Sequence, residues 1–104
     1  MTGARRMTRG IIMRQQIAET LALEALGWIA AQEGLLDAFL HMSGATIEDV
    51  RRDAGKPAFL IGVLDFLMAE DARVMSFCDA HGHDYEAPMR ARAALPGGRA
   101  HHWT

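Results

Sequence analysis

One ten-residue segment concentrates the side chains that could do chemistry. Residues 77–86, "FCDAHGHDYE", contain the only cysteine of the chain, two of its five histidines and three of its thirteen acids. A thiolate and imidazoles are ligands that zinc prefers, so Cys78, His81 and His83 are the candidate metal ligands. A cysteine near a histidine can also act as a nucleophile with its base.

The spacing of these residues disfavours both chemistries. C-x-x-H-x-H is not the paired spacing of a zinc finger, and a fourth ligand would have to come from His101 or His102 near the C-terminus. A catalytic cysteine needs a base and an orienting group around a pocket, for which a small domain offers little room. We therefore predict no metal, no cofactor and no catalytic residue, and a protein that is not an enzyme.

Length and composition indicate one small domain. The chain has 104 residues, of which 50% are apolar, enough for a single core and too many for a disordered chain. One cysteine cannot form an intramolecular disulfide, which favours a reducing, cytoplasmic compartment. No apolar run reaches the roughly 18 to 20 residues of a membrane span, because the longest, residues 57–69, is interrupted by Asp65.

The charges are distributed unevenly along the chain. Residues 1–14 contain four arginines and no acid, and residues 88–104 contain three arginines and no acid. Residues 15–87 hold all thirteen acids against four cations, a net charge of −9. An acidic body with basic ends would repel duplex DNA over most of its surface.

The hydrophobic pattern predicts helices and no sheet, because apolar residues recur at helical spacing and no segment alternates with period two. Thr46 with Asp49 forms a short capping box, Asp71 and Asp84 are predicted N-caps, and Pro57 suits a first helical turn. Gly44 and Gly82 are placed to end helices. The predicted helices cover residues 15–31, 35–43, 46–55, 57–70, 71–81 and 85–95.

A shift of 38 residues aligns residues 21–54 with residues 59–92 without a gap. Leu26, Ala31, Phe39, Gly44, Glu48 and Arg52 then meet identical residues. We predict an all-α fold, a compact six-helix bundle of two pseudo-symmetric three-helix repeats, residues 17–55 and 57–95, related by a pseudo-two-fold axis. The single domain covers residues 13–96, and the basic arm 1–12 and the tail 97–104 are predicted to be flexible.

The repeat also provides an internal control for the segment 77–86. Its phenylalanine, glycine and last glutamate recur in residues 39–48, whereas Cys78 aligns with Leu40 and the two histidines align with a serine and an alanine. The recurring positions are structural, and Cys78 takes the place of a leucine. We therefore interpret the segment as a helix junction in which Cys78 is a small buried hydrophobic residue.

Two surfaces remain as candidates for function. Leu23 and Ile61 lie off the main buried faces of their helices, which favours a non-enzymatic module that binds an unidentified protein partner or a second copy of itself. The alternative is a small nucleic-acid-associated regulator that uses Arg90, Arg92 and Arg99 of the sixth helix and tail as anion contacts. A third hypothesis is a metal-responsive protein.

Residues 13–98 resemble a bacterial family known as domain of unknown function 3572. The resemblance is carried by the Ala/Leu-rich first helix and by the segments "FL…G…DVRR", "FLIGVLDFLMAED" and "RARAALPGG". It implies a small cytoplasmic bacterial protein, of alphaproteobacterial origin, and brings no functional residues with it. The twelve residues before Met13 depart from the family pattern, which favours Met13 as the start of the folded protein.

Overall fold

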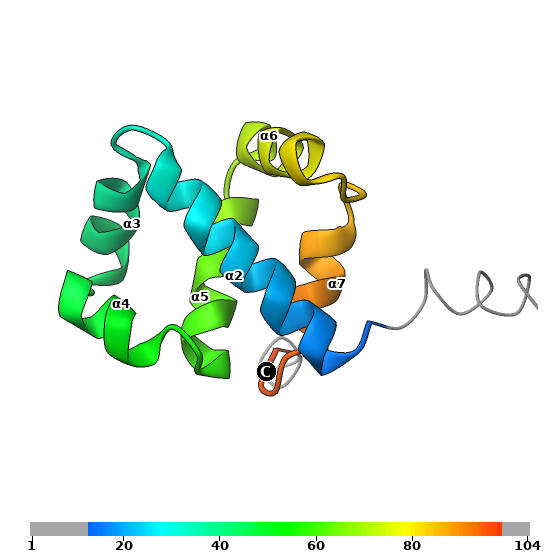
Figure 1. Ribbon diagram of the computed structural model, residues 1–104, viewed down its shortest axis with the longest axis horizontal. Helices are drawn as coiled ribbons and strands as arrows, with labels where there is room; N and C mark the ends of the chain where they lie inside the picture. Colours follow the sequence, from blue (N-terminus) through cyan, green and yellow to red (C-terminus); the bar gives the residue numbers. More distant parts are fainter. Residues whose placement is uncertain (1–12, 99–104) are drawn as a thin grey trace, which may run out of the picture.

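The computed structural model describes residues 13–98, and this part of the chain folds into six α-helices without a β-strand (Figure 1). The all-α prediction is confirmed. The arm 1–12 and the tail from residue 99 onward lie outside the described residues. The helices are α2 (Gln15–Ala31), α3 (Leu35–Ser43), α4 (Ile47–Asp53), α5 (Pro57–Met68), α6 (Asp71–His81) and α7 (Ala87–Ala94).

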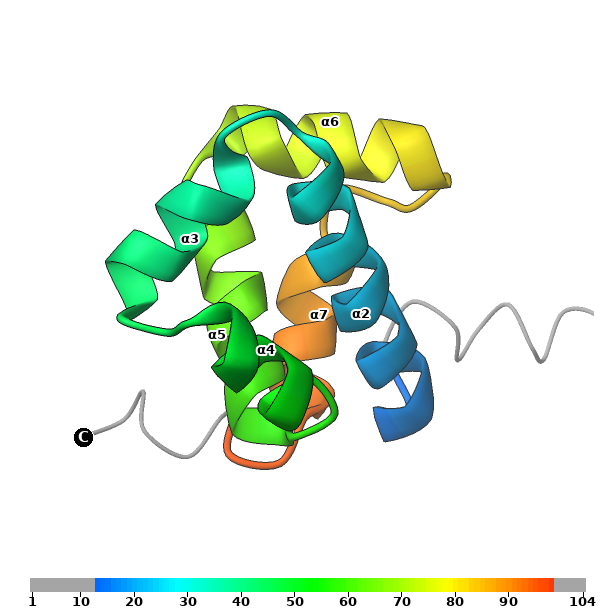
Figure 2. The ribbon, with the colours of Figure 1, turned by 60° about the vertical axis from the view of Figure 1, so that its left-hand side comes forward.

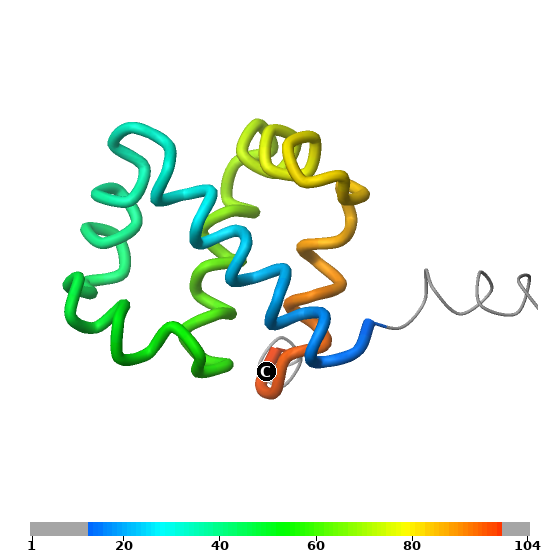
Figure 3. Tube along the Cα trace, viewed as in Figure 1, coloured from blue at the N-terminus to red at the C-terminus, as the bar shows by residue number. Residues whose placement is uncertain are grey.

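Helices α2 and α5 cross at the centre of the molecule, with α3 and α4 on one side and α6 and α7 on the other (Figures 1 and 3). Helix α2 packs against α5, α7 and α3, and α7 packs against α5 as well. The turned view separates α2 from α5 and shows α7 next to both of them (Figure 2). The three helices α2, α5 and α7 therefore enclose most of the core.

The core is made of small residues on α2 and large ones on α5. Helix α2 buries three alanines, which lets the neighbouring helices approach closely, while five residues of α5 are buried. The rings of Phe39 and Phe66 meet edge to face with centroids 5.4 Å apart, and Trp28 meets Phe77 in the same way at 6.1 Å. The buried residues of α5 are Leu60, Val63, Leu64, Phe66 and Leu67.

Most predicted helix ends are confirmed. Gly44 and Gly82 end α3 and α6 in the left-handed conformation, with φ of 76° and 73°. The side chain of Thr46 accepts a hydrogen bond from the backbone of Asp49, whose carboxylate accepts one in return, so the capping box is present. Pro57 occupies the first turn of α5.

Two predicted N-caps are wrong. Glu70 and Glu86, not Asp71 and Asp84, stand at the N-cap positions of α6 and α7. Helix α7 begins at Ala87 because Pro88 has no amide hydrogen and fits only a first helical turn. The carbonyl of Asp84 instead accepts a hydrogen bond from Ala87 in the preceding turn, at 2.9 Å.

The two predicted repeat units share the order of a long helix followed by two shorter ones, and both bury their equivalent phenylalanine, Phe39 and Phe77. Their third helices differ. Helix α7 buries Ala87, Pro88 and Ala91, whereas none of the seven residues of α4 is buried. The pseudo-two-fold relation between the units stays a prediction.

The chain turns back after α7 and ends the described domain on a buried glycine. Gly97 has φ of +89°, and Gly98 is so close to the preceding helix that a Cβ atom would lie 1.7 Å from the carbonyl oxygen of Arg92. Arg92 Nη1 donates to the carbonyl oxygen of Gly98 at 2.6 Å. Gly97 and Gly98 thus belong to the folded domain and not to a flexible tail, because the turn packs against α7.

Candidate interaction surface

Cys78 lies in the core, where it does not meet the histidines as a metal ligand would. The thiol donates a hydrogen bond to the carbonyl oxygen of Asp84 at 3.3 Å. Burial raises the pKa of the Cys78 thiol, and the carboxylates of Asp79 and Asp84 raise it further. The sulfur therefore stays protonated at neutral pH, and a protonated thiol is a weak nucleophile and a poor metal ligand.

The two histidines of the junction stack on each other. The rings of His81 and His83 are nearly parallel with centroids 6.4 Å apart, and both lie beside Phe77. His83 Nε2 is 2.7 Å from Glu24 Oε1, a contact that ties the junction to α2. Within residues 13–98, no three His, Cys, Asp or Glu side chains are placed to hold a metal ion, and His101 and His102 lie outside that range.

The candidate anion contacts Arg90 and Arg92 are held in ion pairs. Arg90 contacts Glu86 at 3.1 Å and Asp84 at 3.4 Å, on the same segment of the chain. Arg92 binds both carboxylate oxygens of Asp65 on α5 through Nε and Nη2. Both arginines are mostly buried and their charges are compensated within the domain, so they form no free basic patch. Arg99 lies outside the described residues.

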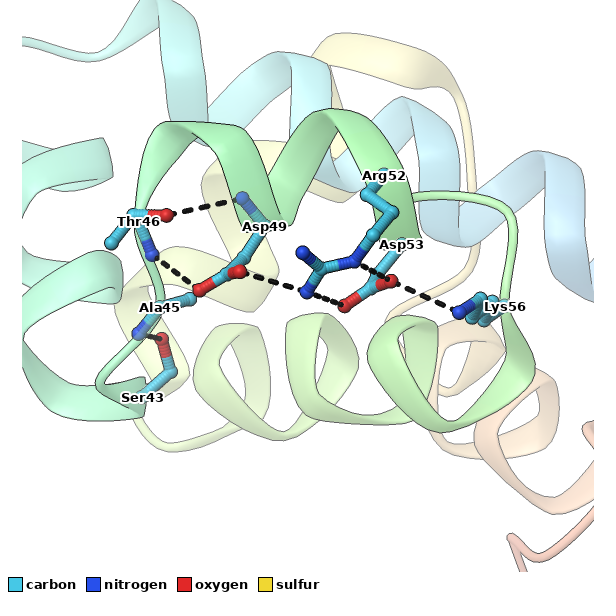
Figure 4. Close-up of polar contacts among 7 residues, drawn as sticks. All are labelled: Ser43, Ala45, Thr46, Asp49, Arg52, Asp53 and Lys56. Atoms are coloured by element: carbon cyan, nitrogen blue, oxygen red, sulfur yellow. Dashed lines mark hydrogen bonds and ion pairs between the residues drawn. The ribbon is translucent and has the colours of Figure 1, made fainter.

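The charged residues of α4 form a local network (Figure 4). Arg52 lies 2.8 Å from Asp49 and 3.0 Å from Asp53, and Lys56 lies 3.2 Å from Asp53. The backbone amide of Thr46 and the Arg52 side chain lower the pKa of Asp49, while Arg52 and Lys56 lower that of Asp53. These contacts stabilise a helix that buries none of its residues.

The outward face of α2 exposes large apolar side chains. Leu23 is 45% exposed and Ile17 is 54% exposed. Figure 1 shows α2 crossing the front of α5 and α7. The face also lacks charge at its centre, because the remaining exposed residues there are Gln16, Thr20, Gly27, Ala30 and Ala31.

Ile61, the second predicted surface residue, is not open in the same way. It is partly buried and packs against the core. The turn after α7 lies over it, since a Cβ atom on Gly97 would be 3.9 Å from Ile61 Cδ1. Leu23 and Ile61 occupy equivalent positions of the repeat, but only Leu23 presents a broad apolar surface to solvent.

A shallow depression of about 320 Å³ lies between the end of α2, α3 and α6. Its walls come from two segments that are distant in the sequence, residues 28–35 and 72–76, which only the tertiary structure brings together. Arg73, its cation, already donates to the carbonyl oxygen of Phe66 at 2.7 Å and lies 4.1 Å from the centroid of that ring. The depression is lined by Trp28, Gln32, Glu33, Leu35, Ala72, Arg73 and Ser76.

The fold and the face of α2 that contains Leu23 define a small all-helical protein with an exposed helix face that has no charge at its centre. The chain belongs to the family described as "Protein of unknown function (DUF3572)", whose model matches residues 15–98. The resemblance found in the sequence is thereby confirmed. No curated protein and no solved structure matches the chain. None of the helices between residues 13 and 98 has the length and apolar character needed to cross a membrane.

Proposed function

We propose that this protein is a non-enzymatic interaction module that binds another protein through the outward face of α2. One observation carries the proposal. Leu23 is exposed next to Gly27, and apart from the adjacent residues and the backbone of α2 itself, no described atom lies within 4 Å of the place where a Cβ atom of Gly27 would be. A glycine inside a helix costs about 0.5–1 kcal/mol relative to alanine, and no neighbour within residues 13–98 requires it here.

A glycine beside an exposed leucine would let the backbone of another chain approach the helix closely. Leu23 supplies apolar surface that is removed from water on binding. Gly27 has no side chain, so the backbones of the two chains can come closer together. The face has no charge at its centre, so no ionised group would have to lose its hydration without a partner.

The other hypotheses have less support. A regulator that binds nucleic acid would need cations free to meet phosphates, whereas Arg90 and Arg92 are paired with acids of the domain. A metal-responsive protein would need Cys78 to meet the histidines, and its thiol instead donates to the Asp84 carbonyl. The single buried cysteine favours a cytoplasmic location, which we include in the proposal.

The proposal is tested by affinity capture from the native cell with the tagged full chain. The Leu23→Glu variant should lose a partner protein that the wild type retains, while circular dichroism shows the same helical content. Met89→Glu is the matched control, because Met89 on α7 is also exposed, at 58%. Capture that is unchanged by Leu23→Glu would contradict the proposal. Sub-micromolar, sequence-dependent DNA binding that Arg90→Glu abolishes would favour the nucleic-acid hypothesis instead.

A further inference from the structure

The repeat aligns an exposed pair of positions on α2, one helical turn apart and called a step here, with a covered pair of positions on α5. With the shift of 38 residues, Leu23 and Gly27 correspond to Ile61 and Asp65. On α5 both positions are in contact with the end of α7 and the turn that follows it. Arg92 binds the carboxylate of Asp65, and Gly97 lies beside Ile61. On α5 these positions therefore accept a short helix end with a basic side chain, which Asp65 binds. Helix α2 has Gly27 in place of Asp65, so a cation docked there would have to meet the neighbouring carboxylates of α2.

On α2 the same step has no such cover among the described helices. The third helix of the first unit, α4, cannot pack as α7 does, because its residues equivalent to Ala87 and Ala91 are Asp49 and Asp53. Small residues let α7 lie in the core, whereas carboxylates must keep their water or their cations. They are held by Arg52 and Lys56 instead.

The charges of α2 complement a basic helix. Between residues 15 and 31 there are two acids, Glu19 and Glu24, and no lysine or arginine. Both glutamates are partly exposed, on the flanks of the face that contains Leu23. Glu24 Oε1 already contacts His83 and Glu19 Oε2 accepts a hydrogen bond from Gln15, which leaves one oxygen of each carboxylate for an arginine or lysine of a docked helix. A partner with acids at those positions would be repelled.

We infer that the Leu23–Gly27 step of α2 is the docking site for a short basic helix of a partner protein, with the chemistry that α7 has: small residues on its inner face and arginines beside them. The inference rests on the proposed function and adds the kind of segment that is bound. Close approach occurs at Gly27, the apolar contact is made by Leu23, and Glu19 and Glu24 meet the cations.

The test uses a labelled synthetic peptide with the sequence of residues 85–98, "YEAPMRARAALPGG", and the full-length chain. Fluorescence anisotropy should show saturable binding with a Kd below about 200 μM, an affinity appropriate to a small helix–helix contact. Leu23→Glu should weaken this binding at least tenfold, and a peptide with glutamate in place of its arginines should not bind. Met89→Glu should leave the affinity unchanged.

A second variant separates binding from folding. Gly27→Leu improves the helix propensity of α2 and meets open space, so the domain should fold, but the added side chain blocks close approach. We expect at least a tenfold loss of peptide affinity. An affinity that Leu23→Glu and Gly27→Leu leave unchanged, or no saturation at about 1 mM peptide, would overturn the inference.

Analytical sedimentation of the chain alone tests whether a second copy of this chain, instead of a partner's helix, occupies the Leu23–Gly27 step. A dimer at micromolar concentration that Leu23→Glu converts to monomer would identify a second copy as the occupant and overturn the inference. Failure of the peptide to bind, combined with loss of a captured protein in Leu23→Glu, would overturn the inference but leave the proposed function standing. Failure in both assays would reject both.

Discussion

Replacing Arg92 with methionine should destabilise the domain more than any other single arginine substitution on its described surface. The side chain of Arg92 is only 19% exposed and joins three segments: α7, Asp65 on α5, and the carbonyl oxygen of Gly98. Methionine keeps an unbranched aliphatic side chain for packing and removes the charged head. The substitution therefore isolates the polar contacts of the guanidinium from the packing of its stem.

The magnitude follows from the exposure of each contact. Asp65 is 50% exposed, so the ion pair is screened and contributes about 0.5–1 kcal/mol. The hydrogen bond from the charged guanidinium to the carbonyl of Gly98 contributes about 1.5 kcal/mol, because Gly98 is buried and its carbonyl would lose this partner. The free energy of unfolding should fall by about 2 kcal/mol, which lowers Tm by about 10 °C in a domain of this size.

Urea unfolding followed by circular dichroism at 222 nm measures this loss. Asp65→Asn should cost no more than about 1 kcal/mol, since it removes only the ion pair. In the double variant, Asp65→Asn should add little to Arg92→Met because the two residues share that contact. The control is Arg51→Met on the exposed surface of α4, which should change stability by less than about 0.5 kcal/mol. An Arg92→Met loss as small as that of the control would refute the reasoning.

Four further predictions concern the glycines, Cys78, the cap of α4 and the acids of α4. Gly98→Ala should lower the free energy of unfolding by about 1–3 kcal/mol, because its Cβ atom would clash with the Arg92 carbonyl, while Gly27→Ala should raise it by up to about 1 kcal/mol in the same urea assay. Cys78 should react with a thiol reagent at pH 8 only after unfolding in urea, and Cys78→Ala should cost about 1–2 kcal/mol through a small cavity; rapid labelling of the native protein would contradict its burial. Thr46→Ala should cost about 1 kcal/mol and speed amide exchange in α4. Because the folded-state pKa values of Asp49 and Asp53 are lowered, their contribution to the stability of α4 is complete at neutral pH and is lost as the pH falls through those values, below about 4. Protection factors in α4, which are exchange rates corrected for the intrinsic effect of pH, should therefore fall in acid; protection factors that stay constant from neutral pH into acid would contradict this sign.

Sequence and structure agree best where the information is local. The capping box of Thr46, the left-handed glycines Gly44 and Gly82 and the burial of Cys78 were all predicted. Each depends on hydrogen bonds within about four residues or on the apolar periodicity of one helix, both of which are visible in a short stretch of chain. The helix junction in residues 77–86 was understood for the same reason, with an internal repeat as its control.

The candidate surface required the tertiary structure. Leu23 and Ile61 look alike in the sequence and are equivalent in the repeat, yet Ile61 is covered by the turn at Gly97 while Leu23 is exposed. Arg92 was expected to be available to an anion, and it instead binds a carboxylate 27 residues away. Contacts of this kind depend on how whole helices pack, which periodicity within each helix does not specify. The sequence by itself thus determined the helices and most of their ends. The packing of α7, and not of α4, in the core decided that Leu23 of α2 is exposed while Ile61 of α5 is covered, because only α7 has small residues on its inner face.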